Sequence, residues 1–187
     1  PEAKIWCTVN EPLVHLGGGY VMGLTPPQKS DFGALRAPLV GMLRAHAEAY
    51  RELHESARLA GRTIQVGMAH HLRIFDPKRN WNPIDRGIAR VLDRAFNWTL
   101  PNALESGQVD MRIPGLLRIR EEIPGLARTQ DYFGLNYYTR DLVTLGVNRG
   151  RIEPVPSVMR DRPTNDLGWE IYPEGFVRVL RELHRRY

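Results

Sequence analysis

The fold is decided by the stretch AKIWCTVNEP, residues 3–12. Apolar residues alternate with others from Ile5 to Val9, which predicts a buried β-strand. Glu11 follows at the end of that strand, and Pro12 cannot continue a central strand because it has no N–H group to donate. We therefore expect a carboxyl group at the rim of a sheet, on firm backbone, where it can act on a bound molecule.

The rest of the chain alternates between helix and strand patterns. Further strands are predicted for TIQVGMAH, residues 63–70, and DYFGLNYYT, residues 131–139. Helices are predicted over 33–60 and 83–106, and a last helix runs from Pro173 to the end of the chain. Strands that alternate with helices predict an α/β fold of parallel strands joined by right-handed crossovers.

Both long helices show one apolar face at spacings of three or four residues. The face of the first comprises Leu35, Leu39, Leu43, Ala47, Tyr50 and Leu53, and that of the second Ile84, Ile88, Val91, Ala95, Phe96 and Leu100. Ser30 or Asp31 can cap the start of the first helix and Gly61 its end. Pro101 is expected to kink or divide the second helix.

Two stretches are predicted to be irregular. The glycines and prolines of residues 15–30 predict a loop, and the lack of a Gly-Lys-Ser/Thr or fitted G-x-G-x-x-G motif argues against phosphate binding there. After the strand at 131–139 we expect more than twenty irregular residues, to about Pro163.

Length and composition indicate one globular domain. The chain has 187 residues, of which 42% are hydrophobic, and we expect a single domain over 1–187. Its net charge is +5, but the arginines are spread along the helices near glutamates, so we expect no nucleic-acid partner.

The cysteine content and the hydropathy of the chain indicate in which cellular compartment we expect it. Cys7 is the only cysteine, which favours a reducing, cytoplasmic location. No apolar run is long enough to span a membrane, so no membrane partner is expected. Because the chain starts with Pro1, the sequence leaves targeting open.

Polar and aromatic side chains gather where the predicted strands end. Asn10 and Glu11 follow the first strand, Asn136 and Tyr138 end the third, and the loop NDLGWEIYPEG leads to the last helix. Sites of parallel α/β folds lie at the carboxyl ends of strands. An acid flanked by amides, phenols and indoles suits a sugar, because amides bond hydroxyl groups and aromatic rings stack on pyranose C–H faces.

Histidines raise the alternative of a metal site. No H-x-x-x-H pattern or cysteine pair accompanies them, so we expect core or surface histidines and no metal or cofactor. The histidines weighed are His15, His46, His70 and His71, and His46 is expected to be a helix-packing residue.

Four motifs together resemble glycoside hydrolase family one, the β-glucosidase family. They are WCTVNEP, HLGGGYVMG, DYFGLNYYTR and DLGWEIYPEGF, and LRAHAEAYRELHE resembles the helix after the family's acid/base strand. The resemblance runs essentially from end to end. It implies a (β/α)8 TIM barrel and a retaining β-glycosidase that acts by double displacement on β-glucosides or related β-glycosides.

The resemblance implies a role for each matching residue. Glu11 matches the general acid/base, and Asn10 matches the residue that bonds the sugar 2-hydroxyl. Tyr138 matches the phenol that is bonded to the nucleophilic carboxylate, and Trp169 matches an aromatic residue beside the aglycone. Asn136 belongs to the same strand end as Tyr138 and is expected to support the site.

The chain also departs from the family pattern. A retaining mechanism needs two carboxyl groups about 5–5.5 Å apart, and the family's Thr-Glu-Asn-Gly nucleophile motif does not occur in these 187 residues. The match corresponds roughly to barrel strands 4 to 6 with their helices, a central fragment. We therefore expect that the isolated chain is inactive and that its open sheet edges favour self-association. Gln28 stands where the family often has glycine.

Two other readings remain. One is a non-catalytic sugar-binding or structural barrel protein that kept the barrel pattern without the nucleophile. The other is a basic nucleic-acid-binding domain, which predicts salt-dependent binding that we do not expect. Within the family, the glutamate of GWEIYPEG favours the glucosidase branch over the branch that cleaves phosphorylated sugars, which usually has glutamine at the position of Glu170.

Overall fold

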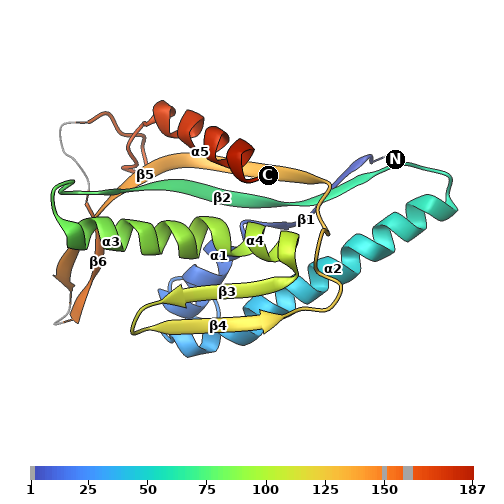
Figure 1. Cartoon of the computed structure of the whole chain (residues 1–187), viewed down its shortest axis with the longest axis horizontal. Coiled ribbons are helices and arrows are strands. Elements are labelled where there is room, and N and C mark those ends of the chain that lie inside the picture. The colour runs from blue at the N-terminus through green and yellow to red at the C-terminus, as the bar shows by residue number, and fades with distance from the viewer. Residues whose placement is uncertain (1–2, 149–150, 158–161) are drawn as a thin grey trace. The chain divides into compact units, whose positions relative to one another are not determined.

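The computed structural model describes residues 3–148, 151–157 and 162–187 (Figure 1). The chain forms two compact units. Unit 1 comprises Pro1–His71 and Trp98–Asn136, and unit 2 comprises Leu72–Asn97 and Tyr137–Tyr187. The strands form a four-stranded sheet in the order β1-β2-β5-β6 and a two-stranded sheet of β3 and β4. The predicted α/β class is confirmed, and the single domain stays a prediction. In the described part of the chain, no helix is long and apolar enough to cross a bilayer.

Unit 1 begins with the predicted first strand, β1 (Ile5–Asn10), which pairs in parallel with β2 (Gln65–Pro77). The prediction that this strand is buried is wrong, because Ile5 is 64% and Trp6 41% exposed. The reason is its place in the sheet: β1 lies at one end of the strand order, and among the described strands it pairs only with β2. Apolar alternation predicts a strand but not which strand lies at the edge.

The predicted loop at 15–30 begins instead with helical turns. The α-helix α1 (Pro12–Leu16) leads directly into η1, a π-helix over Gly17–Val21. Proline suits the first helical position because it needs no N–H there. Gly19 is buried, and a Cβ atom on it would lie 2.7 Å from the carbonyl oxygen of Pro26. The glycines thus allow a close backbone approach and do not break the helix.

The first long helix is confirmed. It consists of a 3-10 turn, η2 (Phe32–Leu35), followed by α2 (Arg36–Leu59). Asp31 caps its start by accepting a hydrogen bond of 2.8 Å from the Gly33 N–H, and Gly61 follows its end with φ +63°. Of the predicted apolar face, these residues are buried: Leu35, Leu39, Leu43 and Ala47.

A β-hairpin that the sequence analysis missed completes unit 1. After α4 (Thr99–Ser106), the strands β3 (Gln108–Ile113) and β4 (Leu117–Glu122) pair antiparallel. The residues of its buried face are Val109, Met111 and Ile119. The alternation on both sides of a Pro-Gly turn was the available signal.

α3 (Pro83–Leu92), in unit 2, and the π-helix η3 (Asp93–Trp98), which lies in unit 2 up to Asn97, form most of the second predicted helix. The break falls where α4 begins at Thr99, close to Pro101 as expected. The prediction that Ile84 lies on the buried face is wrong: it is 56% exposed, whereas Asp85 is fully buried. Asp85 turns inward because it accepts hydrogen bonds from Arg79 and from Thr144 Oγ1.

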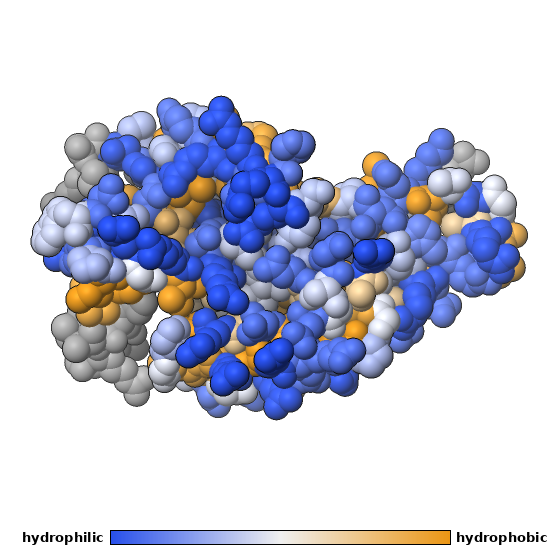
Figure 2. Space-filling view, in the orientation of Figure 1, coloured by the Kyte–Doolittle hydropathy of each residue, from blue (hydrophilic) through white to orange (hydrophobic). Residues whose placement is uncertain are grey.

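The predicted irregular stretch is mostly a second hairpin. β5 (Tyr132–Asn148) continues past the expected end of the strand, and β6 (Arg151–Ser157) pairs antiparallel with it. The prolines of β6 are compatible with this pairing, because an edge strand tolerates proline. Residues 149–150 and 158–161 of that stretch lie outside the described residues. The last helix, α5 (Pro173–Arg186), is as predicted, and Figure 2 shows mainly hydrophilic side chains over it.

Candidate active site

Glu11 occupies a strained backbone position. It lies between β1 and α1 with φ 50° and ψ 54°, in the left-handed region that side-chain-bearing residues rarely adopt. Its N–H donates a hydrogen bond of 2.8 Å to the carbonyl oxygen of Ala69 on β2. Strained residues of this kind concentrate at functional sites, where the surrounding structure holds them.

Asn136 joins the acid to its neighbouring amide. Its Nδ2 donates to Glu11 Oε1 over 2.7 Å and to Asn10 Oδ1 over 3.0 Å. Glu11 and Asn136 are half-buried, and Asn10 is exposed. The structure thus brings three of the predicted site residues together in unit 1.

The strands that carry these residues approach each other closely. On β5, a Cβ atom at Gly134 would lie 2.8 Å from both Ala69 Cα and the Met68 carbonyl oxygen of β2. The Tyr132 hydroxyl donates to the Trp6 carbonyl oxygen over 3.1 Å. Glycine at position 134 therefore places Asn136 near the end of β1.

In unit 2, Tyr138 and Trp169 lie together. Their ring centroids are 5.7 Å apart in an edge-to-face arrangement, and the side chains are 47% and 36% exposed. The Arg73 guanidinium lies 6.0 Å from the centroid of the Trp169 ring. The convergence of this aromatic pair with Glu11 on one sugar stays a prediction.

A group of charged residues that the sequence analysis missed surrounds the Trp169 loop. We call it the arginine anchor, and its members are Asp76, Arg140, Glu170 and Arg178. Hydrogen bonds from Arg140 hold the pKa of Glu170 below its usual value. Burial raises the pKa of Asp76, but bonds from Arg178 and Arg140 lower it overall. These partners lie far apart in sequence, and no local pattern reveals them.

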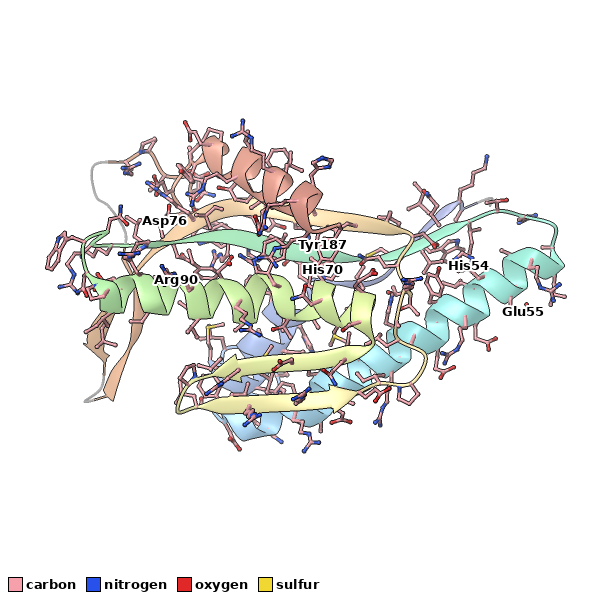
Figure 3. All side chains as sticks on the ribbon, in the orientation of Figure 1. His54, Glu55, His70, Asp76, Arg90 and Tyr187 are labelled. Carbon is pink, nitrogen blue, oxygen red and sulfur yellow. The ribbon has the colours of Figure 1, made fainter. Side chains whose placement is uncertain are left out.

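Just before β5 lies a second group that the sequence analysis missed, the aspartate anchor. Asp131 accepts hydrogen bonds from the Tyr50 hydroxyl (2.6 Å) and the Val66 N–H (2.8 Å), and its Oδ2 lies 2.7 Å from His54 Nε2. Burial raises the pKa of Asp131, but these hydrogen bonds lower it overall. His54 lies on α2 near this end of the strand (Figure 3).

Buried histidines hold the two residues before Asp131. His46 Nε2 lies 2.7 Å from the Thr129 carbonyl oxygen, and His46 Nδ1 lies 2.6 Å from Thr8 Oγ1. His70 Nε2 lies 3.1 Å from Gln130 Oε1. Burial lowers the pKa of His46, and it lowers that of His70 to about 4. Both imidazoles are therefore neutral near pH 7 and belong to the core. Among the described residues, no group of three or more His, Cys, Asp or Glu side chains is arranged to hold a metal ion.

An acid that follows the carboxyl end of a parallel strand, as Glu11 follows β1, is typical of α/β-barrel enzymes. The comparisons with known proteins agree, since the model of glycosyl hydrolase family 1 matches residues 2–187. The chain belongs to this family.

Its relatives are named as β-glycosidases. A β-galactosidase of Sulfolobus acidocaldarius is 27% identical over 99% of this chain and 37% of its own length. A solved β-glycosidase from Pyrococcus horikoshii is 28% identical, with a TM-score of 0.76 over 94% of this chain and 38% of that chain. The β-glucosidase from Thermotoga maritima in complex with glucoimidazole is 25% identical, with a TM-score of 0.75 over 97% and 41%. The chain thus spans about 40% of the length of these relatives.

Proposed function

We propose that the complete protein is a retaining β-glycosidase in which Glu11 is the general acid/base. The observation that carries the proposal is the contact of Asn136 with both Glu11 (2.7 Å) and Asn10 (3.0 Å). This contact leaves Glu11 beside an amide that can bond a sugar hydroxyl. In the first step Glu11 protonates the leaving oxygen, and in the second it deprotonates the water that attacks the glycosyl-enzyme.

The remaining site residues complete the proposal. Asn10 bonds the sugar 2-hydroxyl, Asn136 supports Glu11, Tyr138 bonds the nucleophilic carboxylate and Trp169 lies beside the aglycone. β-Glucosides and β-galactosides are the proposed substrates, in line with the names of the relatives. We further propose a cytoplasmic location, because Cys7 is a free cysteine.

The test is Glu11→Gln in the protein that carries this sequence together with a nucleophile. We expect turnover of a β-glucoside with a poor leaving group to fall by about 10²–10⁴-fold, because protonation of the leaving oxygen is lost. The matched control is Glu52→Gln, an exposed glutamate on α2, which we expect to leave turnover unchanged. A fall of less than about threefold for Glu11→Gln would show that the assignment is wrong.

The 187-residue chain alone is proposed to be inactive, because it carries no Thr-Glu-Asn-Gly motif. Its open β1 edge is proposed to mediate self-association. Enzyme-like hydrolysis of an aryl β-glucoside by the purified chain would disprove inactivity, and a monomer at high concentration would disprove association. The coding sequence past Tyr187 distinguishes the enzyme from a non-catalytic sugar-binding protein. If it encodes Thr-Glu-Asn-Gly, the enzyme is supported. A stop codon supports the non-catalytic protein.

A further inference from the structure

The loop that carries Trp169 is braced from within. Asn165 Oδ1 accepts hydrogen bonds of 3.0 Å from the N–H groups of Leu167 and Trp169. The Asn165 N–H donates to the Trp169 carbonyl oxygen over 2.9 Å, and Gly168 has φ +76°. The indole therefore projects from a closed turn and not from a free loop.

The same turn is bonded to β5 at the residue next to Trp169. Thr139 Oγ1 donates to the Glu170 carbonyl oxygen over 2.8 Å. Arg140 donates to the two carboxylate oxygens of Glu170 through Nε (2.8 Å) and Nη2 (3.0 Å), and both side chains are about nine-tenths buried. Two consecutive strand residues thus hold Glu170 by its backbone and its side chain. Bidentate bonds of this kind define orientation as well as distance.

Arg140 is itself held on its remaining sides. Its Nη1 donates to Asp76 Oδ2 over 3.2 Å, and its guanidinium lies 4.0 Å from the centroid of the Tyr172 ring. Asp76 lies near the carboxyl end of β2 (Figure 3), where it also accepts two hydrogen bonds of 2.8 Å from Arg178 of α5. The guanidinium has little freedom to move with the loop.

Held in this way, Trp169 lies close to an aromatic ring and to a cation. Tyr138 is edge-on to it at 5.7 Å, and Arg73 lies 6.0 Å from its ring centroid. Arg73 is bonded in turn to Asp141 over 2.8 Å, and their side chains are 21% and 16% exposed. The exposed part of the indole therefore forms a flat surface of defined orientation, which suits the stacking of a planar apolar group.

We propose that Glu170 and Arg140 are positioning residues that set selectivity for aglycones with flat aromatic groups, by fixing the orientation of Trp169. The substrate part of this proposal rests on the proposed glycosidase function, and the positioning part does not. Neither residue touches the reacting atoms. The bidentate pair acts only through the indole, so its loss reduces binding of a planar aglycone and leaves the chemical step unchanged.

The positioning part is tested on the chain itself with Glu170→Gln, which keeps the shape of the side chain and removes its charge. The signal of Trp169 is isolated by subtracting the fluorescence of the matching Trp169→Phe variants. We expect acrylamide quenching of Trp169 to rise about twofold, because glutamine accepts through one oxygen only and the bidentate ion pair with Arg140 is lost. The control is Glu182→Gln, which removes a carboxylate bonded to Arg185 and Arg186 within α5 and should leave quenching unchanged. Equal quenching in Glu170→Gln and the native chain would overturn the proposal.

The selectivity part is tested with the same variants in the complete protein. For Glu170→Gln we expect KM for phenyl β-D-glucoside to rise about tenfold, the worth of one charged hydrogen bond, with kcat unchanged. KM for methyl β-D-glucoside should stay the same, because methyl offers no planar group. Equal rises for both substrates, or no rise for either, would overturn the selectivity part. If the native protein hydrolyses neither glycoside, the proposed function is wrong, and the quenching result still decides the positioning part.

Discussion

Just before β5, Asp131 and its two preceding residues are bonded to imidazole, phenol and amide groups, whereas further along the strand Arg140 is bonded to two carboxylates. Burial lowers the pKa values of His46 and His70, so below about pH 6.5 the unfolded chain takes up protons before the folded one and the fold loses stability. A guanidinium stays charged at every working pH. The bonds before β5 and the bonds of Arg140 therefore differ in the pH range over which they stabilise the fold. Only the region before β5 is sensitive to mild acid, through the buried histidines His46 and His70 next to the aspartate anchor.

The largest expected effect comes from Asp131→Ala, which removes the centre of the aspartate anchor. The Tyr50 hydroxyl, the Val66 N–H and His54 lose their shared partner. We expect the free energy of unfolding to fall by about 3 kcal/mol, measured by urea denaturation. Asp166→Ala, at an exposed loop position, should change it by less than about 0.5 kcal/mol. Equal effects of the two variants would mean that the aspartate anchor contributes nothing.

Mild acid should weaken the region before β5 and leave the arginine anchor unchanged. The pKa of His70 is lowered from 6.5 to about 4, so the unfolded chain binds the proton first and stability is lost as pH falls from about 6.5 to 4. At pH 5 the loss from His70 is about 2 kcal/mol, and the lowered pKa of His46 adds to it. The lowered carboxylate pKa values of Asp76 and Glu170 keep the arginine anchor intact until the pH falls below about 4.

Hydrogen exchange at pH 7 and pH 5, corrected for intrinsic rates, measures this difference. Amides of residues 132–136 should lose protection at pH 5, and those of residues 138–142 should keep it. His70→Phe, which retains a ring against Phe133, should weaken the pH dependence. Equal loss of protection in both segments would show that the anchors do not differ.

Arg140→Lys tests the other anchor and should have a smaller effect. Lysine keeps the charge but loses the bidentate bonds to Glu170 and the stacking on Tyr172. We expect a loss of about 1–2 kcal/mol in the free energy of unfolding, the same at pH 5 and pH 7. Arg181→Lys, at an exposed position on α5, is the matched control. A loss that grew between pH 7 and pH 5 would contradict the assignment.

The smallest expected effect is that of His54→Gln. The His54 side chain is 35% exposed, and its contact with Asp131 is one of three. We expect a change in unfolding free energy below about 1 kcal/mol, as for exposed ion pairs. Thermal unfolding at pH 7 checks this value. A loss of unfolding free energy as large as that of Asp131→Ala would mean that His54 accounts for the whole contribution of the aspartate anchor.

Sequence patterns predicted what neighbouring residues determine. The alternation around Val66, the helical face at Leu39 and Leu43, and the end of a strand at Asn10 all follow from local periodicity. The expected strand end at Asn136 and Tyr138 is wrong, because both residues lie within β5. Both anchors were missed because their members come from separate elements, and only the fold brings them together. The glycines of η1 were misread, since the same residues that break regular structure also permit close backbone contacts.

The left-handed backbone conformation of Glu11 lowers the stability of the fold at the residue that the proposed catalysis needs. A glycine at that position would relieve the strain, which is about 1–2 kcal/mol for a residue with a side chain, and would abolish the proposed proton transfer. Directed evolution for heat resistance alone, with no sugar in the selection, should therefore discard the glutamate early. The acid is retained only where hydrolysis is selected.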